Sequence, residues 1–267
     1  MGRPSPPTPL LSVLPSSSGL GLATVQDLIK DNAYVAILDL SPPPDGKLAS
    51  SHDQRCIFIK TDITKHDDVQ GAVTRTVEWT KETGAVLGGV VNCAGIGRPE
   101  LVIGSKARPH SMKSWELTMA INLTGTFNLT RLTLQHLVKV PPEEGEDGER
   151  GVVIFVSSVS AYEGQAGQTA YAASKGAIRA MTLPMARDLA RHHIRVVTIA
   201  PSPFTTPLTD QFSEKVRENM AKSGLLYPKR YGIPKEFAAT VRWVLECAYV
   251  NGESIRLTGG SRVPASL

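Results

Sequence analysis

Gly151-Val-Val-Ile-Phe-Val-Ser-Ser158 is the stretch of this sequence that decides the fold. Its apolar, β-branched residues run without interruption and stop at two hydroxyl side chains, which predicts a buried strand. An amphipathic segment follows, and its spacing predicts a helix from Tyr171 to about residue 190. A buried strand followed by a helix is the unit from which α/β proteins are built.

The same alternation extends along the whole chain. It predicts strands at 10–14, 34–39, 56–60, 86–91, from 151, at 194–200 and at 254–257, and helices at 19–31, 67–83, 115–138, 171–190 and 234–249. Alternating strands and helices imply a parallel sheet with right-handed crossovers. We therefore expect one α/β domain over residues 18–267, a doubly wound Rossmann-type sheet of seven strands flanked by helices. Residues 1–17 are rich in Pro and Ser and are expected to be irregular, apart from a short strand at 10–14.

Composition narrows the class of protein. The chain has 267 residues, of which 41% are hydrophobic and 20% charged, which is typical of a globular domain. No apolar run reaches the ~18 residues of a membrane span. Three scattered cysteines predict neither a disulfide framework nor a metal site. The net charge of +4 suits anionic ligands such as dinucleotides and acyl-CoA. Without a concentrated basic run or aromatic platform, nucleic-acid binding is not expected.

A candidate acid–base pair lies in Tyr171-Ala-Ala-Ser-Lys175. Residues four apart share one face of a helix, so the phenol and the ammonium can approach each other. A nearby cation favours the phenolate and lowers its pKa, and such a tyrosine can exchange a proton with an alcohol oxygen. Alone the pair is a weak signal, because any amphipathic helix can carry it on its wet face. Ser158, thirteen positions earlier, ends a strand where α/β sheets bind ligands, and Ser157 is the competing candidate.

A candidate dinucleotide site begins at Ser18-Gly19-Leu20-Gly21, at the start of a predicted helix. Glycines let the backbone approach a pyrophosphate, and a helix N-terminus favours its negative charge. Asp39 ends the second strand, where a carboxylate can bind the adenosine ribose diol and repel a 2′-phosphate. The sequence therefore favours NAD over NADP, although an aspartate at a strand end can also simply cap a turn.

Together these motifs resemble those of the short-chain dehydrogenase/reductase family, in its order and at its spacings. The matching residues are Gly19-Leu-Gly21, Asp39, Asp62, Asn92-Cys-Ala-Gly95, Asn122, Ser158, Tyr171 and Lys175. The resemblance extends from about residue 18 to the end of the chain. It implies hydride transfer between a nicotinamide and a secondary alcohol or ketone. Within the family it points to the members that oxidise 3-hydroxyacyl-CoA in fatty acid β-oxidation, or a hydroxysteroid.

The resemblance also implies roles for individual residues. Tyr171 would be the acid/base, Lys175 would lower its pKa and bind the nicotinamide ribose, and Ser158 would hold the substrate oxygen. Asn122 would anchor a water that links Lys175 to solvent. The implied NAD contacts are Ser18, Gly19, Leu20, Gly21, Asp39, Asp62, Ile63, Asn92, Ala94, Gly95, Tyr171, Lys175, Pro201, Phe204 and Thr206. The implied substrate contacts are Ser158, Gln165 and Tyr171, with Phe212 either lining the pocket or packing in the core.

One motif departs from the family pattern. Leu14-Pro15 stands where the family has Thr-Gly at the glycine-rich turn. Proline has a fixed φ and no N–H, so we expect weakened cofactor binding. The alternative function is therefore a catalytically impaired, dehydrogenase-like assembly subunit. The family further suggests a homotetramer built on helices near 115–138 and 171–190. It also suggests a mitochondrial location, although the first residues lack the pattern of a transit peptide and a cytoplasmic location is the alternative.

Overall fold

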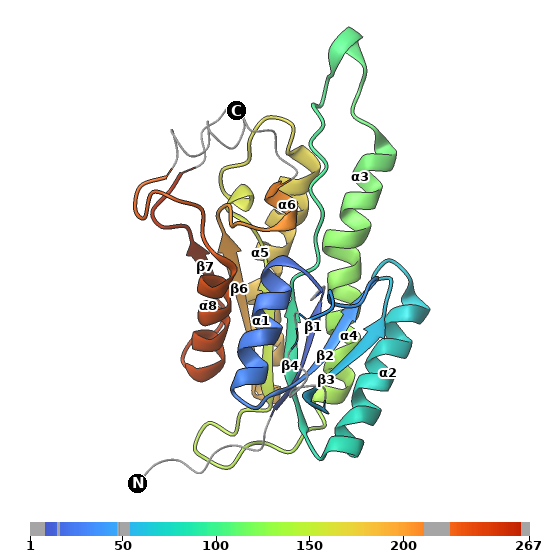
Figure 1. Ribbon diagram of the computed structural model, residues 1–267, viewed down its shortest axis with the longest axis vertical. Helices are drawn as coiled ribbons and strands as arrows, with labels where there is room; N and C mark the ends of the chain where they lie inside the picture. Colours follow the sequence, from blue (N-terminus) through green and yellow to red (C-terminus); the bar gives the residue numbers. More distant parts are fainter. Residues whose placement is uncertain (1–8, 15–16, 47, 49–53, 211–224, 263–267) are drawn as a thin grey trace.

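A parallel sheet of seven strands forms the centre of the molecule (Figure 1). The computed structural model describes residues 9–14, 17–46, 48, 54–210 and 225–262. The strand order is β3-β2-β1-β4-β5-β6-β7. The bounds of the strands are Pro9–Leu14 (β1), Tyr34–Asp39 (β2), Cys56–Lys60 (β3), Val86–Asn92 (β4), Gly151–Val156 (β5), Ile194–Pro201 (β6) and Ser254–Leu257 (β7). The predicted doubly wound α/β fold is confirmed.

The sheet has its topological switch point between β1 and β4. From β1 the chain builds outward through β2 to β3, and then returns to place β4 on the other side of β1. Open α/β sheets bind ligands in the crevice at the carboxyl ends of the strands beside such a reversal. The N-terminal boundary expected at residue 18 needs correction, because β1 pairs with β2 and β4 in the middle of the sheet.

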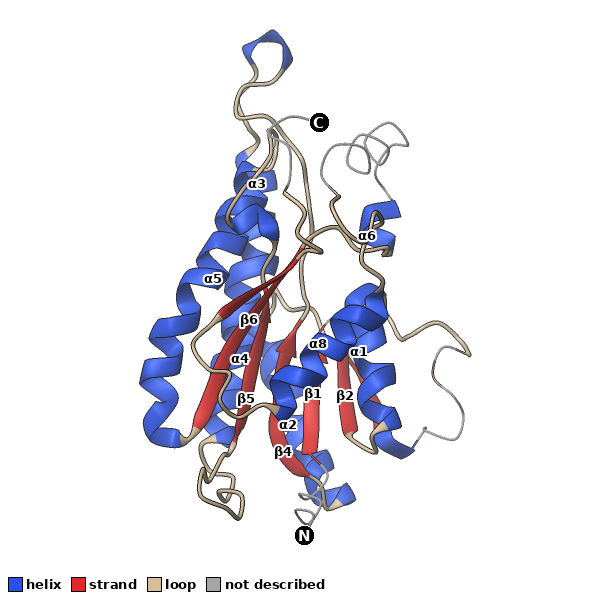
Figure 2. Ribbon diagram, turned by 90° about the vertical axis from the view of Figure 1, so that its left-hand side faces the viewer, coloured by secondary structure: helices blue, strands red, loops and turns tan. Residues whose placement is uncertain are grey.

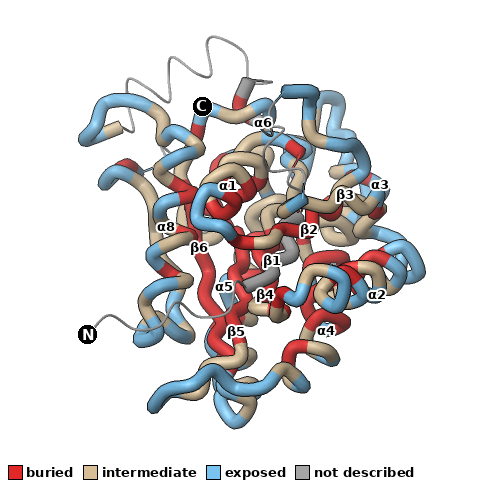
Figure 3. Tube along the Cα trace, turned by 60° about the horizontal axis from the view of Figure 1, so that its bottom comes forward, coloured by how far each residue is buried: buried red, intermediate tan, exposed pale blue. Residues whose placement is uncertain are grey.

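Helices cover both faces of the sheet (Figure 2). One face carries α1 (Gly19–Lys30) and α8 (Pro234–Glu246). The other carries α2 (His66–Thr83), α4 (Thr126–Leu137) and α5 (Thr169–Leu189). Both faces of the central strands are therefore covered, and every residue of β5 and β6 is buried (Figure 3). This explains the unbroken apolar run that identified β5 in the sequence.

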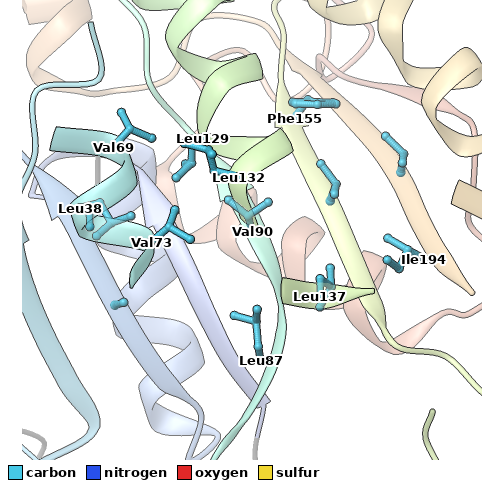
Figure 4. Close-up of a cluster of buried hydrophobic side chains, with 14 of the residues drawn as sticks. Leu38, Val69, Val73, Leu87, Val90, Leu129, Leu132, Leu137, Phe155 and Ile194 are labelled. Atoms are coloured by element: carbon cyan, nitrogen blue, oxygen red, sulfur yellow. The ribbon is translucent and has the colours of Figure 1, made fainter. Parts of the chain in front are cut away.

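The core between the sheet and the α2–α4–α5 layer is built mainly from aliphatic side chains, together with Phe155 and Trp79. Figure 4 shows several of the aliphatic residues and Phe155. Leu129, Leu132 and Leu137 of α4 are at most 2% exposed and belong to the same buried cluster as Val90 and Phe155. Burying a leucine side chain stabilises a protein by roughly 1.5–3 kcal/mol. These contacts fix the distance of α4 from the carboxyl ends of β4 and β5.

The long helix predicted over 115–138 is not one regular helix. It begins as α3 (Met112–Met119), continues through a π-helical segment at Ala120–Gly125, and ends as α4. A π-helical segment accommodates an extra residue in a turn and often occurs at functional sites. Here it contains Asn122, one of the residues that the family resemblance selects.

A short helix, α6 (Pro207–Asp210), follows β6. Residues 211–224 lie outside the described part of the chain, and so does the candidate pocket residue at position 212. Within the described residues, no helix is long and apolar enough to cross a membrane.

Candidate active site

Four predicted residues gather at the carboxyl ends of β4 and β5. Ser158 lies just past β5, Tyr171 and Lys175 lie in the first two turns of α5, and Asn122 lies in the π-helical segment. The Ser158 hydroxyl lies close enough to the Tyr171 phenol to favour its ionised form. The Asn122 Nδ2 donates to Ser174 Oγ at 3.0 Å, which joins the π-helical segment to α5. Residues that are far apart in the sequence therefore form one group.

The choice between the two serines follows from their partners. Ser157 Oγ donates to the Lys175 carbonyl oxygen at 2.7 Å and is 2% exposed. Ser158 Oγ instead faces Tyr171 and accepts a bond from the Ser160 N–H at 3.1 Å. Ser157 therefore fastens α5 to the sheet, and Ser158 is the hydroxyl beside the phenol.

Lys175 is a buried cation held by backbone carbonyl groups. The residue is 3% exposed, and its Nζ donates to Val156 O at 2.8 Å and to Ala94 O at 3.5 Å. Burial lowers the pKa of Lys175 to about 8, against a smaller opposing effect of Cys93. The Nζ atom lies 5.9 Å from the centroid of the Tyr171 ring. The ammonium is thus close to the phenol without being bonded to it.

The predicted direction of the Tyr171 pKa is wrong for this structure. Burial raises the pKa of Tyr171 above its ordinary value, and the hydrogen bond from Ser158 offsets only part of the effect. Desolvation disfavours the phenolate, and Lys175 Nζ donates its hydrogen bonds to backbone carbonyl oxygens. The i to i+4 spacing predicted the proximity of the two heads correctly, but it carried no information about burial.

Asn122 clamps the turn after β4. The residue is fully buried, its Oδ1 accepts from the Ile96 N–H at 2.8 Å, and its Nδ2 donates to Ile96 O at 3.0 Å. Gly95 lies against this clamp, since a Cβ there would be 3.0 Å from Lys175 Nζ and 3.5 Å from Asn122 Oδ1. The backbone between Ala94 and Ile96 is therefore held open beside the buried ammonium, where any side chain would fill the space.

The N-terminus of α1 is suited to an anion. Its N-cap residue, Ser18, makes no side-chain cap, and the first turn contains no acidic residue. The first N–H groups of a helix lack intrahelical partners and attract negative charge. Gly19 has a φ of +54° and lies close to Thr206, whose Cβ is 3.4 Å from the position a Cβ would take at Gly19. The segment after β6 thus meets the start of α1.

Asp39 ends β2, and backbone N–H groups hold its carboxylate. Its Oδ2 accepts from the Ser17 N–H at 3.0 Å, and its Oδ1 accepts from the Leu40 N–H at 2.7 Å. The Ser17 hydroxyl bonds the Ser41 carbonyl oxygen as well. The carboxylate therefore caps the turn, and at the same time it is fixed at the end of β2 next to the glycine-containing turn.

The loop after β3 packs against the π-helical segment that contains Asn122. Asp62 Oδ1 accepts from the N–H and the hydroxyl of Thr64, and these bonds lower the pKa of Asp62. Ile63 packs against Gly125 so closely that a Cβ there would be 2.6 Å from Ile63 Cγ1 and 2.7 Å from its carbonyl oxygen. The loop that the resemblance assigns to adenine therefore touches the π-helical segment directly.

Three other residues from the predicted cofactor contacts lie at or beyond the carboxyl ends of β4 and β6. Asn92 is 1% exposed, its Nδ2 donates to Thr130 Oγ1 at 3.2 Å, and its Oδ1 has no partner among the described residues. Phe204 is buried edge-on against Phe237, with ring centroids 6.3 Å apart. The Thr206 N–H donates to Thr209 Oγ1 at 3.0 Å, at the start of α6.

Sequence reasoning missed Gln168 and Ser160, which hydrogen bonds connect to Ser158. Gln168 bonds both Ser160 and Gln165 through its side chain. The spacing of Gln165 and Gln168, three positions apart in a short turn, was the available signal. Two glutamines at this spacing are too common to indicate a site without the geometry of the loop.

The residues present fit a dinucleotide, as three observations indicate: an uncapped helix N-terminus, a glycine turn that side chains would fill, and a buried ammonium bonded to two backbone carbonyl oxygens. Within the described ranges, no group of three or more His, Cys, Asp or Glu residues could hold a metal ion. The hydroxyl pair Ser158 and Tyr171 can exchange a proton with a substrate oxygen.

Comparisons with known proteins agree with this geometry. The family model described as short chain dehydrogenase matches residues 11–217. The chain is 42% identical to bovine 3-hydroxyacyl-CoA dehydrogenase type-2 over 249 residues, and 41% identical to the human protein over 248 residues; each match covers 92% of both chains. It is also similar to the crystal structure of 3-hydroxyacyl-CoA dehydrogenase type-2 from Mycobacterium avium, with a TM-score of 0.86, 33% identity and 96% of each chain covered. The chain therefore belongs to the short-chain dehydrogenase/reductase family.

Proposed function

We propose that this protein is an NAD-dependent dehydrogenase that interconverts a secondary alcohol and a ketone, with a 3-hydroxyacyl-CoA thioester as its substrate. The observation that carries the proposal is the grouping of the Ser158 hydroxyl, the Tyr171 phenol and the Lys175 ammonium, whose Nζ lies 5.9 Å from the centroid of the phenol ring. The group lies at the carboxyl ends of β5 and its neighbours, where an α/β sheet binds ligands.

In the proposed oxidation, Tyr171 takes the hydroxyl proton of the substrate while the hydride leaves the carbon. Ser158 donates a hydrogen bond to the oxygen as it gains negative charge. Because burial raises the pKa of Tyr171, the phenolate needs a compensating positive charge, and the Lys175 ammonium supplies it. The nicotinamide supplies the hydride acceptor, and this chain orients the reacting groups and provides their electrostatic environment. In the reverse direction Tyr171 returns the proton to the ketone oxygen.

A preference for NAD rests on Asp39. Its carboxylate is fixed by the N–H groups of Ser17 and Leu40, so it cannot easily swing away from a 2′-phosphate. A carboxylate at this place favours the ribose diol of NAD. Initial rates with NAD and NADP at equal concentration test the preference, and equal or faster turnover with NADP would contradict it.

The substrate class is supported by the two mammalian relatives, both named 3-hydroxyacyl-CoA dehydrogenase type-2. The direct test follows NADH absorbance with a series of 3-hydroxyacyl-CoA thioesters and, in parallel, a series of hydroxysteroids. We expect turnover with the thioesters. Turnover with the steroids alone would move the assignment to a hydroxysteroid dehydrogenase.

A second candidate function, a dehydrogenase-like assembly subunit without catalysis, is favoured by Leu14-Pro15 in place of the family's Thr-Gly. The two functions differ in cofactor binding. Titration of the purified protein with NADH, followed by fluorescence, separates them: saturable binding supports the enzyme. No binding, combined with no turnover on either substrate series, supports the subunit.

The proposed enzyme is a homotetramer. Phe127 on α4 and Leu183 on α5 are 44% and 45% exposed, which is unusual for large apolar side chains on helices that otherwise pack on the sheet. Both lie on the helices that the family resemblance assigns to subunit contact. Light scattering during gel filtration tests the oligomeric state, and a monomer at micromolar concentration would contradict it.

A further inference from the structure

Between β4 and α3 the chain forms an arm, residues 98–111, that projects from the domain. It extends past the sheet and the helices at the end of the molecule where the strands have their carboxyl ends (Figures 1 and 2). Its two sides are joined by an antiparallel bridge between Ile103 and Pro109, and the His110 N–H donates to Val102 O at 2.9 Å. The arm is therefore an ordered hairpin with hydrogen bonds of its own.

Glu100 fastens the base of the arm to the domain. Its N–H donates to Gly167 O at 2.8 Å, in the loop that precedes α5. Its Oε1 accepts from the N–H of Ser111, the N-cap of α3, at 3.0 Å. Glu100 is the one acidic residue between positions 97 and 113, so the arm has no carboxylate further out.

The outer part of the arm is apolar and exposed. Leu101, Val102 and Ile103 follow one another and are 52%, 57% and 59% exposed, and Met112, beside the arm at the start of α3, is 63% exposed. Single exposed apolar side chains are common on protein surfaces. Several of them together on a projecting hairpin indicate an interaction site.

The same surface is basic. Arg98, Lys106 and Arg108 on the arm and Lys113 beside it are all exposed. Among the residues that the structure describes, none of these four side chains forms an ion pair. The arm thus combines unpaired positive charge with exposed apolar side chains, and it needs a partner that is both anionic and apolar.

We infer that the arm binds the surface of an anionic lipid bilayer. Leu101 and Ile103 enter the boundary between headgroups and acyl chains, and Lys106 and Arg108 lie against the headgroup phosphates. Apolar side chains and cations are the two features by which peripheral segments bind such surfaces. The inference goes beyond the proposed dehydrogenase function and does not depend on it.

Two other occupants make different demands. The phosphate groups of an acyl-CoA would use the cations but not the apolar side chains of Leu101 and Ile103. A second copy of this chain would cover the apolar side chains and would change the oligomeric state. A lipid surface uses both features at once, so the loss of either one weakens its binding.

The test is flotation of the purified protein with vesicles of phosphatidylcholine alone, or of phosphatidylcholine and phosphatidylglycerol in equal parts. We expect binding to the mixed vesicles to be at least ~10-fold tighter than to phosphatidylcholine alone, and to weaken at high salt. An apolar-arm variant, Leu101→Ser with Ile103→Ser, and a charge-arm variant, Lys106→Gln with Arg108→Gln, should each weaken binding to the mixed vesicles by ~10-fold or more.

Matched controls make the same kinds of change at the opposite end of the sheet. Lys81→Gln with Lys139→Gln removes two exposed cations near the ends of α2 and α4. Tyr249→Ser removes a fully exposed aromatic side chain between α8 and β7. Both controls should bind the mixed vesicles like the parent protein. Melting temperatures of all the variants should stay near that of the parent, because every replaced side chain is exposed.

Three outcomes overturn the inference. The first is no binding of the mixed vesicles by the parent protein at low salt. The second is a higher KM for an acyl-CoA in the charge-arm variant with unchanged vesicle binding, which assigns the cations to the substrate. The third is a smaller assembly of the apolar-arm variant in light scattering with unchanged vesicle binding, which assigns the arm to a subunit contact. Turnover is measured without vesicles, so failure of the dehydrogenase proposal leaves the vesicle result standing.

Discussion

The two halves of the candidate site are built very differently. On the acid–base side, Ser158, Tyr171, Lys175 and Asn122 are held by many protein partners, and every residue matches the family pattern. On the cofactor side, the turn into α1 has Leu14-Pro15 where the family has Thr-Gly, and the helix start carries no side-chain cap. We therefore expect the chemistry to depend on the first group of residues and the affinity for the dinucleotide to depend on the turn before α1.

This difference suggests that the two properties can change separately. Damage to the acid–base side should reduce the rate of the chemical step, and changes to the turn should alter cofactor binding at a constant rate of chemistry. Each of the following predictions tests this separation, beginning with the largest expected effect.

Replacement of Tyr171 by Phe should lower kcat by at least ~100-fold, the lower range for loss of a general acid–base group. The affinity for NADH should change little, because the ring and the cation beside it remain. Steady-state kinetics and an NADH titration measure the two effects. Tyr162→Phe is the matched control, since the Tyr162 hydroxyl bonds Ser254 Oγ away from the site. Near-normal turnover in Tyr171→Phe would show that another group moves the proton.

Restoration of the family turn with Leu14→Thr and Pro15→Gly should raise affinity for NADH by ~10-fold or more, because glycine permits the close backbone approach that proline obstructs. At saturating cofactor, kcat should stay the same. Fluorescence titration gives the affinity and steady-state assays give kcat. If the double variant binds NADH no better than the parent, the substitution at the turn is not what limits binding.

Gly125→Ala tests the contact between the loop after β3 and the π-helical segment. A Cβ would lie 2.6 Å from Ile63 Cγ1 and 2.7 Å from the Ile63 carbonyl oxygen, so one of the two segments must shift. We expect a loss of ~1–3 kcal/mol in the free energy of unfolding and a several-fold rise in KM for NAD.

Gly71→Ala is the matched control for that variant. Gly71 also lies within a helix, α2, but a Cβ there would meet no atom within 4 Å. It should stabilise the protein by ~0.5–1 kcal/mol through helix propensity and leave the KM for NAD unchanged. Urea denaturation gives the free energy of unfolding of both variants, and steady-state kinetics give their KM for NAD. Equal effects of the two alanines on KM would mean that the Ile63 contact does not influence the cofactor site.

The smallest effect concerns pH. Lys175 has a pKa of about 8 in the folded protein, below the unfolded value of 10.5, so between these values the unfolded state binds more protons and stability rises with pH. From pH 8 to 9 this residue should add about 1 kcal/mol to the free energy of unfolding. Cys93, whose pKa burial raises to about 12, opposes the rise in any variant that keeps it.

Comparison with Lys175→Met isolates the contribution of the lysine, because the thiol is present in both proteins. The free energy of unfolding, measured in urea at pH 7, 8 and 9, should rise more steeply in the parent than in Lys175→Met. Parallel curves would show that the ammonium is not desolvated as the structure indicates.

Short-range patterns in the sequence predicted most of the fold and selected the acid–base residues. Buried strands were visible because helices cover both faces of the sheet, and the i to i+4 rule placed Tyr171 beside Lys175. The raised pKa of Tyr171 and the network of Gln168 were missed for one reason. Both depend on how loops from different parts of the chain bury polar groups, and local spacing does not carry that information.

The π-helical segment at Ala120–Gly125 couples catalysis to the hydrophobic core through simple helix arithmetic. Each residue of an α-helix turns the chain by about 100°, so deleting one residue from the wide turn would rotate everything after it by that angle. Leu129, Leu132 and Leu137 would then swing off the sheet they now cover. A regular α-helix could not replace this segment without disrupting the hydrophobic core. The packing of these three leucines therefore preserves the π-helical turn that holds Asn122.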